Sequence, residues 1–198
     1  MILRNFFSRR FCFLRYNETK EKKEFCIGLH PKGRFDKIID VQSCEIQSDI
    51  ANKILNLVRE ISVKHNIIPY DIKKHTGFLR QLVIRSSDYN NETMVIIVTS
   101  KNNQEKLTPL IDKLSNIKEI RSIINNINHK KADVSYSEEQ YLLYGNDFIT
   151  EKIGNYKFKI SPDSFFQTNS KQTKKLYEII KKEANLKGSE IIYDLYCG

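Results

Sequence analysis

Residues 158–198 combine elements that few folds accommodate in this order. A strand ending at Ile160 meets the sharp turn of Ser161-Pro162, and an amphipathic helix follows whose apolar stripe comprises Leu176, Ile179, Ile180 and Ala184. Residues 191–195 form a short apolar run, as expected of a strand covered on both faces. This run leads into Asp-x-Tyr-Cys-Gly at 194–198. A strand that enters a glycine turn opens a βαβ unit, with a cofactor beyond the strand's carboxyl end.

The chain stops at this turn, because Gly198 is its last residue. We therefore expect a portion of a larger enzyme that lacks the N-terminal part and most of the catalytic domain. The expected fold is an α+β central domain over residues 1–163. The truncated start of an α/β, Rossmann-like domain is expected to follow over residues 164–198.

Hydrophobic periodicity predicts the elements of the central domain. Two amphipathic helices are predicted, one beginning at Ser48, a favourable N-cap residue, and one containing Leu107, Leu110 and Leu114. Asn169 or Ser170 is expected to cap the third helix, and Gly188 stands where a left-handed C-cap belongs. Strands are predicted at 25–30, 36–41, 79–85, 93–99, 120–127 and, joined by Gly154-Asn155, at 147–153 and 156–160.

The net charge of +9 favours a polyanionic partner, RNA or DNA above all. The excess lies at the two ends. Residues 1–16 carry four arginines and no acid, and residues 170–187 carry six lysines against two glutamates. Two interpretations of the second cluster remain open: the solvated face of a helix, or a surface that contacts phosphates.

The four cysteines indicate neither a disulfide framework nor a zinc site, because their spacing is wide and contains no Cys-x-x-Cys. Free thiols are the default in a reducing compartment, so we expect a cytoplasmic protein. No run reaches the roughly 18 apolar residues that a membrane-spanning helix needs.

The segment Ser161-Pro-x-Ser-Phe-Phe-Gln-x-Asn169 is the most specific motif of the chain. Pro162 fixes φ and removes a hydrogen-bond donor. Phe165 and Phe166 can form a stacking surface or fill part of the core. The side-chain amide of Gln167 can both donate and accept hydrogen bonds. By itself the segment is also compatible with core aromatics followed by a helix cap.

Taken together, the motif, the helix that follows it and Asp-Leu-Tyr-Cys-Gly at this separation resemble the RNA uracil C5-methyltransferase family. Residues 28–44 resemble the segment that precedes the helix of the family's central domain, and residues 75–85 resemble its His-x-Gly-x-Leu-Arg strand. The resemblance covers roughly residues 24–198 and is greatest to the branch that methylates 23S rRNA. His75 and Arg80, on that strand, are expected to serve structure or contact with the RNA backbone rather than catalysis.

The resemblance implies S-adenosylmethionine as cofactor and RNA, most of all rRNA, as partner. The family's cofactor contacts match Gln167 and Tyr196, which places the methyltransferase domain over residues 164–198. The 23S rRNA branch carries a 4Fe-4S cluster on four cysteines. Cys44 matches the last of these ligands, whereas Cys12 and Cys26 match none, so a cluster in this chain is not expected to be complete.

The family's chemistry uses a cysteine thiolate that adds to C6 of uracil and a carboxylate that removes the C5 proton. Both residues lie beyond Asp-x-Tyr-Cys-Gly in the family. We therefore expect no catalytic residue in this chain, and Cys197 belongs to the cofactor turn. Two other functions remain open: a tRNA uracil C5-methyltransferase, which lacks the cluster, or a non-catalytic RNA-binding remnant.

Overall fold

A computed structural model describes residues 11–18, 23–34, 36–132, 139–167, 169–193 and 195. The elements follow one another along the chain as β1 (Phe11–Glu18), β2 (Lys23–Leu29), β3 (Ile39–Asp40), α1 (Asp49–Lys64), β4 (Leu79–Ser87), β5 (Glu92–Thr99), the 3-10 turn η2 (Glu105–Leu107), α2 (Thr108–Leu114), β6 (Ile120–Ile127), β7 (Glu139–Gly145), β8 (Ile149–Ile153), β9 (Tyr156–Ile160) and α3 (Ser170–Ala184).

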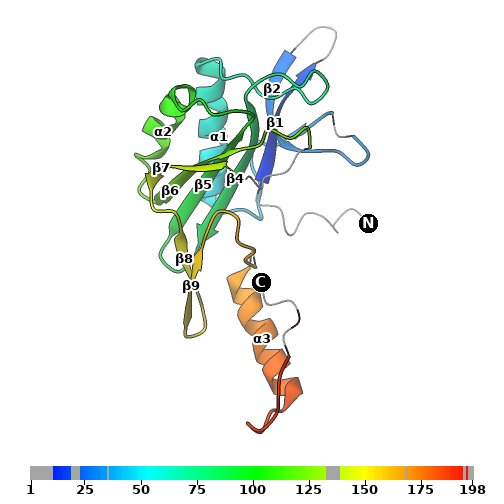
Figure 1. Cartoon of the computed structure of the whole chain (residues 1–198), viewed down its shortest axis with the longest axis vertical. Helices are drawn as coiled ribbons and strands as arrows, with labels where there is room; N and C mark the ends of the chain where they lie inside the picture. Colours follow the sequence, from blue (N-terminus) through cyan, green and yellow to red (C-terminus); the bar gives the residue numbers. More distant parts are fainter. Residues whose placement is uncertain are drawn as a thin grey trace.

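Seven of the strands form one mixed sheet in the order β3-β2-β1-β4-β5-β6-β7. All neighbours are antiparallel except β5 and β6, which are parallel and are connected through α2. A parallel pair requires such a crossover connection. β8 and β9 form a separate antiparallel hairpin. Figure 1 shows α1 and α2 on one face of the sheet, with the hairpin and α3 extending away from its end.

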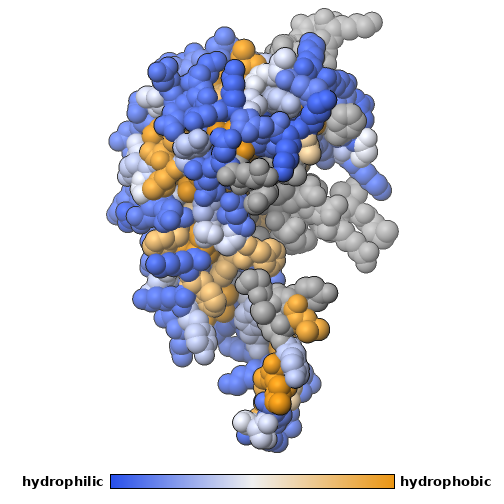
Figure 2. All heavy atoms as spheres, viewed as in Figure 1, coloured by the Kyte–Doolittle hydropathy of each residue, from blue (hydrophilic) through white to orange (hydrophobic). Residues whose placement is uncertain are grey.

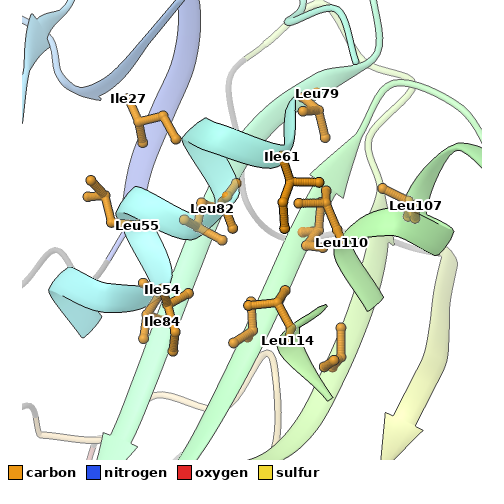
Figure 3. Close-up of a cluster of buried hydrophobic side chains, with 14 of the residues drawn as sticks. Ile27, Ile54, Leu55, Ile61, Leu79, Leu82, Ile84, Leu107, Leu110 and Leu114 are labelled. Carbon is orange, nitrogen blue, oxygen red and sulfur yellow. The ribbon is translucent and has the colours of Figure 1, made fainter. Parts of the chain in front are cut away.

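The larger core lies between the sheet and the two helices α1 and α2 (Figure 3). The side chain of Ser48 accepts a hydrogen bond from the amide of Ala51 at 3.3 Å and so caps α1. The buried residues of α1 recur at helical spacing, so one stripe of the helix faces the sheet. These residues are Ala51, Ile54, Leu55, Val58 and Ile61.

β5 is buried on both faces, which explains its nearly continuous apolar sequence. Val95 and Ile97 belong to the core beneath the helices, whereas Met94, Ile96 and Val98 belong to a second cluster on the opposite face. The hairpin β8–β9 covers this second face with Ile149 and Ile160, and Phe166 packs beside them. The sheet is therefore the middle layer between two helices and a hairpin.

The predicted helices and most of the predicted strands are present. The β8–β9 hairpin turns at Gly154, whose φ of +60° is readily adopted by glycine. Two strands were missed, β1 and β7, and β3 is only two residues long. A mixed sheet with few helices agrees with an α+β architecture, whereas the division of the chain at residue 163 stays a prediction.

The predicted strand at 191–195 is wrong for residues 191–193, which form no regular structure. Ile191 and Ile192 are 80% and 69% exposed. A strand of a parallel sheet obtains its hydrogen bonds and its apolar cover from neighbours, and none of the described residues supplies either here. The helix end also differs from the prediction: α3 ends at Ala184, and its C-cap Asn185 adopts the left-handed conformation that was expected of Gly188.

No helix within the described ranges is long and apolar enough to cross a bilayer.

Candidate functional site

The segment that carries Gln167 is attached to the sheet by its first half. Pro162 is buried, and the ring of Phe166 lies 5.7 Å from that of Phe158 against the second cluster. A guanidinium nitrogen of Arg85 donates to the carbonyl oxygen of Ser164 at 2.6 Å. These contacts fix the position of the backbone just before Gln167.

Asp163 makes a second attachment to the neighbouring strands. The side-chain amide of Gln140, on β7, donates to its carboxylate at 3.1 Å, and that of Asn126, on β6, does so at 3.5 Å. The hydroxyl of Ser164 donates to the carbonyl of Ser161 at 3.0 Å and closes the turn. The turn predicted at Ser161-Pro162 is therefore anchored to three strands.

The two phenylalanines of the motif have opposite environments. Phe166 is half-buried in the second cluster, whereas Phe165 is 84% exposed. Gln167 is exposed as well and makes no hydrogen bond within the part of the chain that the structure describes. Its amide is consequently available to a ligand, whereas its role as a cofactor contact stays a prediction.

A buried carboxylate, which sequence reasoning missed, fixes the start of α3. Glu151 is 3% exposed and accepts hydrogen bonds from the hydroxyl of Ser170 at 2.9 Å and the amide of Asp88 at 3.2 Å. Asn169 caps the helix by accepting from the amide of Gln172 at 3.0 Å. A signal for Glu151 existed, because strand alternation places it on the same face as the buried Ile149 and Ile153.

Tyr196, the other predicted cofactor contact, lies outside the described residues, as do Asp194, Cys197 and Gly198. The predicted approach of Tyr196 to Gln167 therefore stays a prediction. For S-adenosylmethionine the described residues supply the exposed amide of Gln167 on an anchored segment, which fits a polar contact with the cofactor.

Cys44 is a half-buried free thiol in the loop before α1. The backbone amide of Cys44 donates to the side-chain oxygen of Asn52 at 2.9 Å. The side-chain amide of Asn52 donates to the backbone carbonyl oxygen of Cys44 at 3.1 Å. Burial, with a smaller contribution from nearby Cys44, raises the pKa of Cys12 to about 11. A protonated Cys12 is a poor ligand, because metals bind the thiolate.

No group of three or more potential metal ligands occurs among the described residues. These residues do not supply the remaining ligands of an iron–sulfur cluster. The assignment of Cys44 as a ligand stays a prediction.

Arg80 and His75, which were expected on one strand, lie in different elements: Arg80 is on β4, and His75 is in the turn before it. Arg80 is on β4 and 1% exposed, and its guanidinium donates to the carbonyl oxygens of Asn128 at 2.8 Å and Ala132 at 2.9 Å. Of the two roles that the sequence left open for Arg80, structure or contact with the RNA backbone, these hydrogen bonds support the structural one. His75 lies in the turn before β4 with a φ of 53°, and its Nδ1 is 3.3 Å from the hydroxyl of Tyr70. The prediction that His75 is on the strand is therefore wrong.

Sequence comparison connects the chain with known methyltransferases, although no protein-family model matches it. An uncharacterised RNA methyltransferase of Chlorobaculum tepidum is 33% identical over 92% of the chain and 38% of its own length. Another, of Clostridium tetani, is 39% identical over 90% of the chain and 39% of its own length. The chain thus spans about two fifths of the length of these relatives.

A solved structure agrees with the sequence relatives. The tRNA (uracil-54, C5)-methyltransferase of Pyrococcus abyssi, in complex with S-adenosyl-L-homocysteine, matches with a TM-score of 0.66 and 30% identity, over 88% of this chain and 40% of that one. Fold and sequence together therefore place the chain among the RNA methyltransferases. Within this class, the chain belongs to the RNA uracil C5-methyltransferase family.

Proposed function

We propose that the chain is part of an S-adenosylmethionine-dependent enzyme that methylates C5 of uracil in RNA. The observation that carries the proposal is the structural match to a uracil C5-methyltransferase, at 30% identity over 88% of the chain. The net charge of +9 suits an RNA substrate.

Residues 1–163 are proposed to form the supporting, RNA-binding domain, and residues 164–198 the beginning of the methyltransferase domain. Gln167 and Tyr196 are proposed to hold S-adenosylmethionine, which supplies an electrophilic methyl group when bound. Gln167 is suited to this role because its backbone is fixed while its amide is exposed. Methylation is proposed for an enzyme of the relatives' length, and these 198 residues alone are expected to be inactive. The cytoplasm is the proposed location.

Two observations bear on the class of RNA, and they favour different substrates. The resemblance of Cys44 to a cluster ligand favours the branch that acts on rRNA, and this remains our first choice. The structural match to an enzyme named for tRNA favours tRNA. A test of activity must therefore examine both RNAs.

A chimaera tests the proposal. The matching segment of the Clostridium tetani relative is replaced by this chain, and the chimaera is expressed in bacteria that lack 5-methyluridine in rRNA and tRNA. Mass spectrometry of nucleosides should detect 5-methyluridine in one of the two RNAs. Gln167→Ala should raise the KM for S-adenosylmethionine about tenfold, whereas Gln104→Ala, a distant exposed control, should leave it unchanged.

The outcome that contradicts the proposal is equally definite. The unmodified relative serves as the positive control, and circular dichroism verifies that the chimaera is folded. A folded chimaera that forms no 5-methyluridine, while the unmodified relative does, would refute the assignment of this activity.

A further inference from the structure

The outer face of the β8–β9 hairpin carries an uncompensated row of lysines. Lys152 is paired directly with Lys157 across the two strands, and Thr150 is paired with Lys159. Because side chains alternate along a strand, these four residues share one face, opposite to the face that buries Ile149, Glu151 and Ile153. The three lysines are exposed.

No salt bridge neutralises these three ammonium groups within the described ranges of the chain. Like charges directly opposite each other destabilise an antiparallel pair of strands. An anion placed between Lys152 and Lys157 would remove this repulsion. The hairpin therefore favours a ligand with negative charges along its length.

Aromatic rings lie beside the same lysines. The Nζ atoms of Lys152 and Lys157 are 5.5 Å and 5.6 Å from the centroid of the Tyr89 ring, which is 38% exposed in the turn between β4 and β5. The Nζ atom of Lys159 is 4.5 Å from the centroid of the Phe148 ring. Proteins that bind single-stranded nucleic acid combine lysines, which contact the phosphates, with aromatic rings, on which the bases stack.

A pocket of about 320 Å³ adjoins Tyr89 and Lys152, between the hairpin, the β4–β5 turn and the start of α3. This volume lies at the lower end of the range for small-molecule sites. Its two carboxylates are already engaged. Asp88 is 3.4 Å from the ammonium of Lys171, and Glu151 accepts from backbone amides and from Ser170. The electrostatic potential that a ligand meets at this pocket is consequently dominated by the lysines.

The position of this surface relates it to the candidate cofactor segment. Figure 1 shows the hairpin and α3 together at the end of the sheet, and Ser170 of α3 is bonded to Glu151 of the hairpin at 2.9 Å. Gln167 lies three residues before Ser170. The pocket beside Lys152 and Tyr89 is also lined by Ser170, so RNA bound on the lysine face lies beside the start of α3.

We propose that Tyr89, Lys152, Lys157 and Lys159 form a contact surface, the hairpin surface, for a single-stranded segment of RNA. The lysines bind successive phosphates, and one unpaired base stacks on Tyr89. A base-paired helix does not satisfy the surface, since its bases are not free to stack on a side chain. The proposal rests on the proposed function and adds to it the surface on which the RNA beside the target uridine lies.

The purified 198-residue chain and a fluorescein-labelled 12-nucleotide oligouridine test the proposal by fluorescence anisotropy over a series of KCl concentrations. The double variant Lys152→Gln/Lys157→Gln should reduce the slope of log K against log salt by about 0.7 for each phosphate that is no longer neutralised. The matched control, Lys113→Gln/Lys118→Gln at the end of α2 and just after it, removes the same charge on the other face of the sheet and should change affinity less than about twofold.

Substitution of the ring separates stacking from charge. Tyr89→Ala should weaken binding about tenfold, whereas Tyr89→Phe should retain it, because the ring provides the stacking surface. Thermal melts verify that every variant is folded. The proposal is wrong if the control double variant reduces the slope equally, if double-stranded RNA binds as tightly through the same lysines, or if only an acidic peptide binds.

The two proposals of function and surface can fail separately. A chimaera that forms 5-methyluridine, combined with an unchanged salt slope in Lys152→Gln/Lys157→Gln, refutes the hairpin surface alone. Localised binding of oligouridine, combined with a folded but inactive chimaera, refutes the methyltransferase activity alone.

Discussion

Arg80 shows how one buried cation organises a loop. Its guanidinium donates to carbonyl oxygens of residues 128–132, and its Cζ lies 4.2 Å from the centroid of the Tyr70 ring. A buried charged group costs free energy unless it is hydrogen-bonded, and the carbonyls of a loop need donors. Arg80 meets both needs, so the loop after β6 is held against the sheet without regular structure.

We predict that Arg80→Leu lowers the free energy of unfolding by about 3 kcal/mol, because several partly buried carbonyl oxygens lose a charged donor. Urea denaturation measures the change. Arg121→Leu is the matched control, an exposed arginine on β6, and should shift the free energy by no more than about 0.5 kcal/mol. Equal effects of the two substitutions would contradict the structural role of Arg80.

The element that most affects the candidate site is the segment between β9 and α3. It has no regular secondary structure, yet Phe166, Asp163 and the carbonyl of Ser164 attach it to the sheet. Glu151 attaches the first residue of α3 to the hairpin. The position of Gln167 thus depends on contacts across the second face of the sheet rather than on the helix itself.

The two adjacent phenylalanines give a direct test of this attachment. We expect Phe166→Ala to lower the free energy of unfolding by about 2 kcal/mol, because its ring fills the second cluster. Phe165→Ala should change it by less than about 0.5 kcal/mol, since that ring is 84% exposed. Thermal unfolding followed by circular dichroism compares them, and the reverse order would mean that the wrong ring has been assigned to the core.

At the scale of the whole molecule, stability is unevenly distributed. The sheet with α1 and α2 contains most of the buried apolar side chains, whereas Thr173 is the one buried residue among those of α3. Figure 2 shows apolar side chains exposed on this extension, in contrast to the mostly hydrophilic visible surface of the rest. The exposed apolar residues of α3 are Leu176, Tyr177, Ile179 and Ile180.

We predict that backbone amides of α3 exchange hydrogen at least about 100-fold faster than those of β5. A helix of 15 residues is marginal in water without packing, whereas β5 is paired on both edges and buried on both faces. Hydrogen exchange with mass spectrometry measures the ratio. Similar protection of the two elements would show that α3 is stabilised by more than its visible contacts.

Periodicity in the sequence predicted the elements that have one strongly buried face. α1 was found because its apolar residues recur at helical spacing, whereas β5 was found from a continuous apolar run rich in β-branched residues. β7 was missed because it is an edge strand in which every residue is exposed or only half-buried, so its sequence shows no clear alternation. The attachment of the hairpin to the second face was not predictable either, because it joins residues far apart in the chain.

By itself, the sequence determined the helices, the inner strands other than β1, the family resemblance and the identity of Gln167 as a candidate contact. These depend on local spacing and on short motifs, which a single chain displays directly. Only the tertiary structure decided which phenylalanine is buried, that Glu151 fixes the start of α3, and that lysines gather around Tyr89. The physical reason is that burial and charge clustering depend on which distant segments pack together, and alternation along one strand does not specify its neighbour.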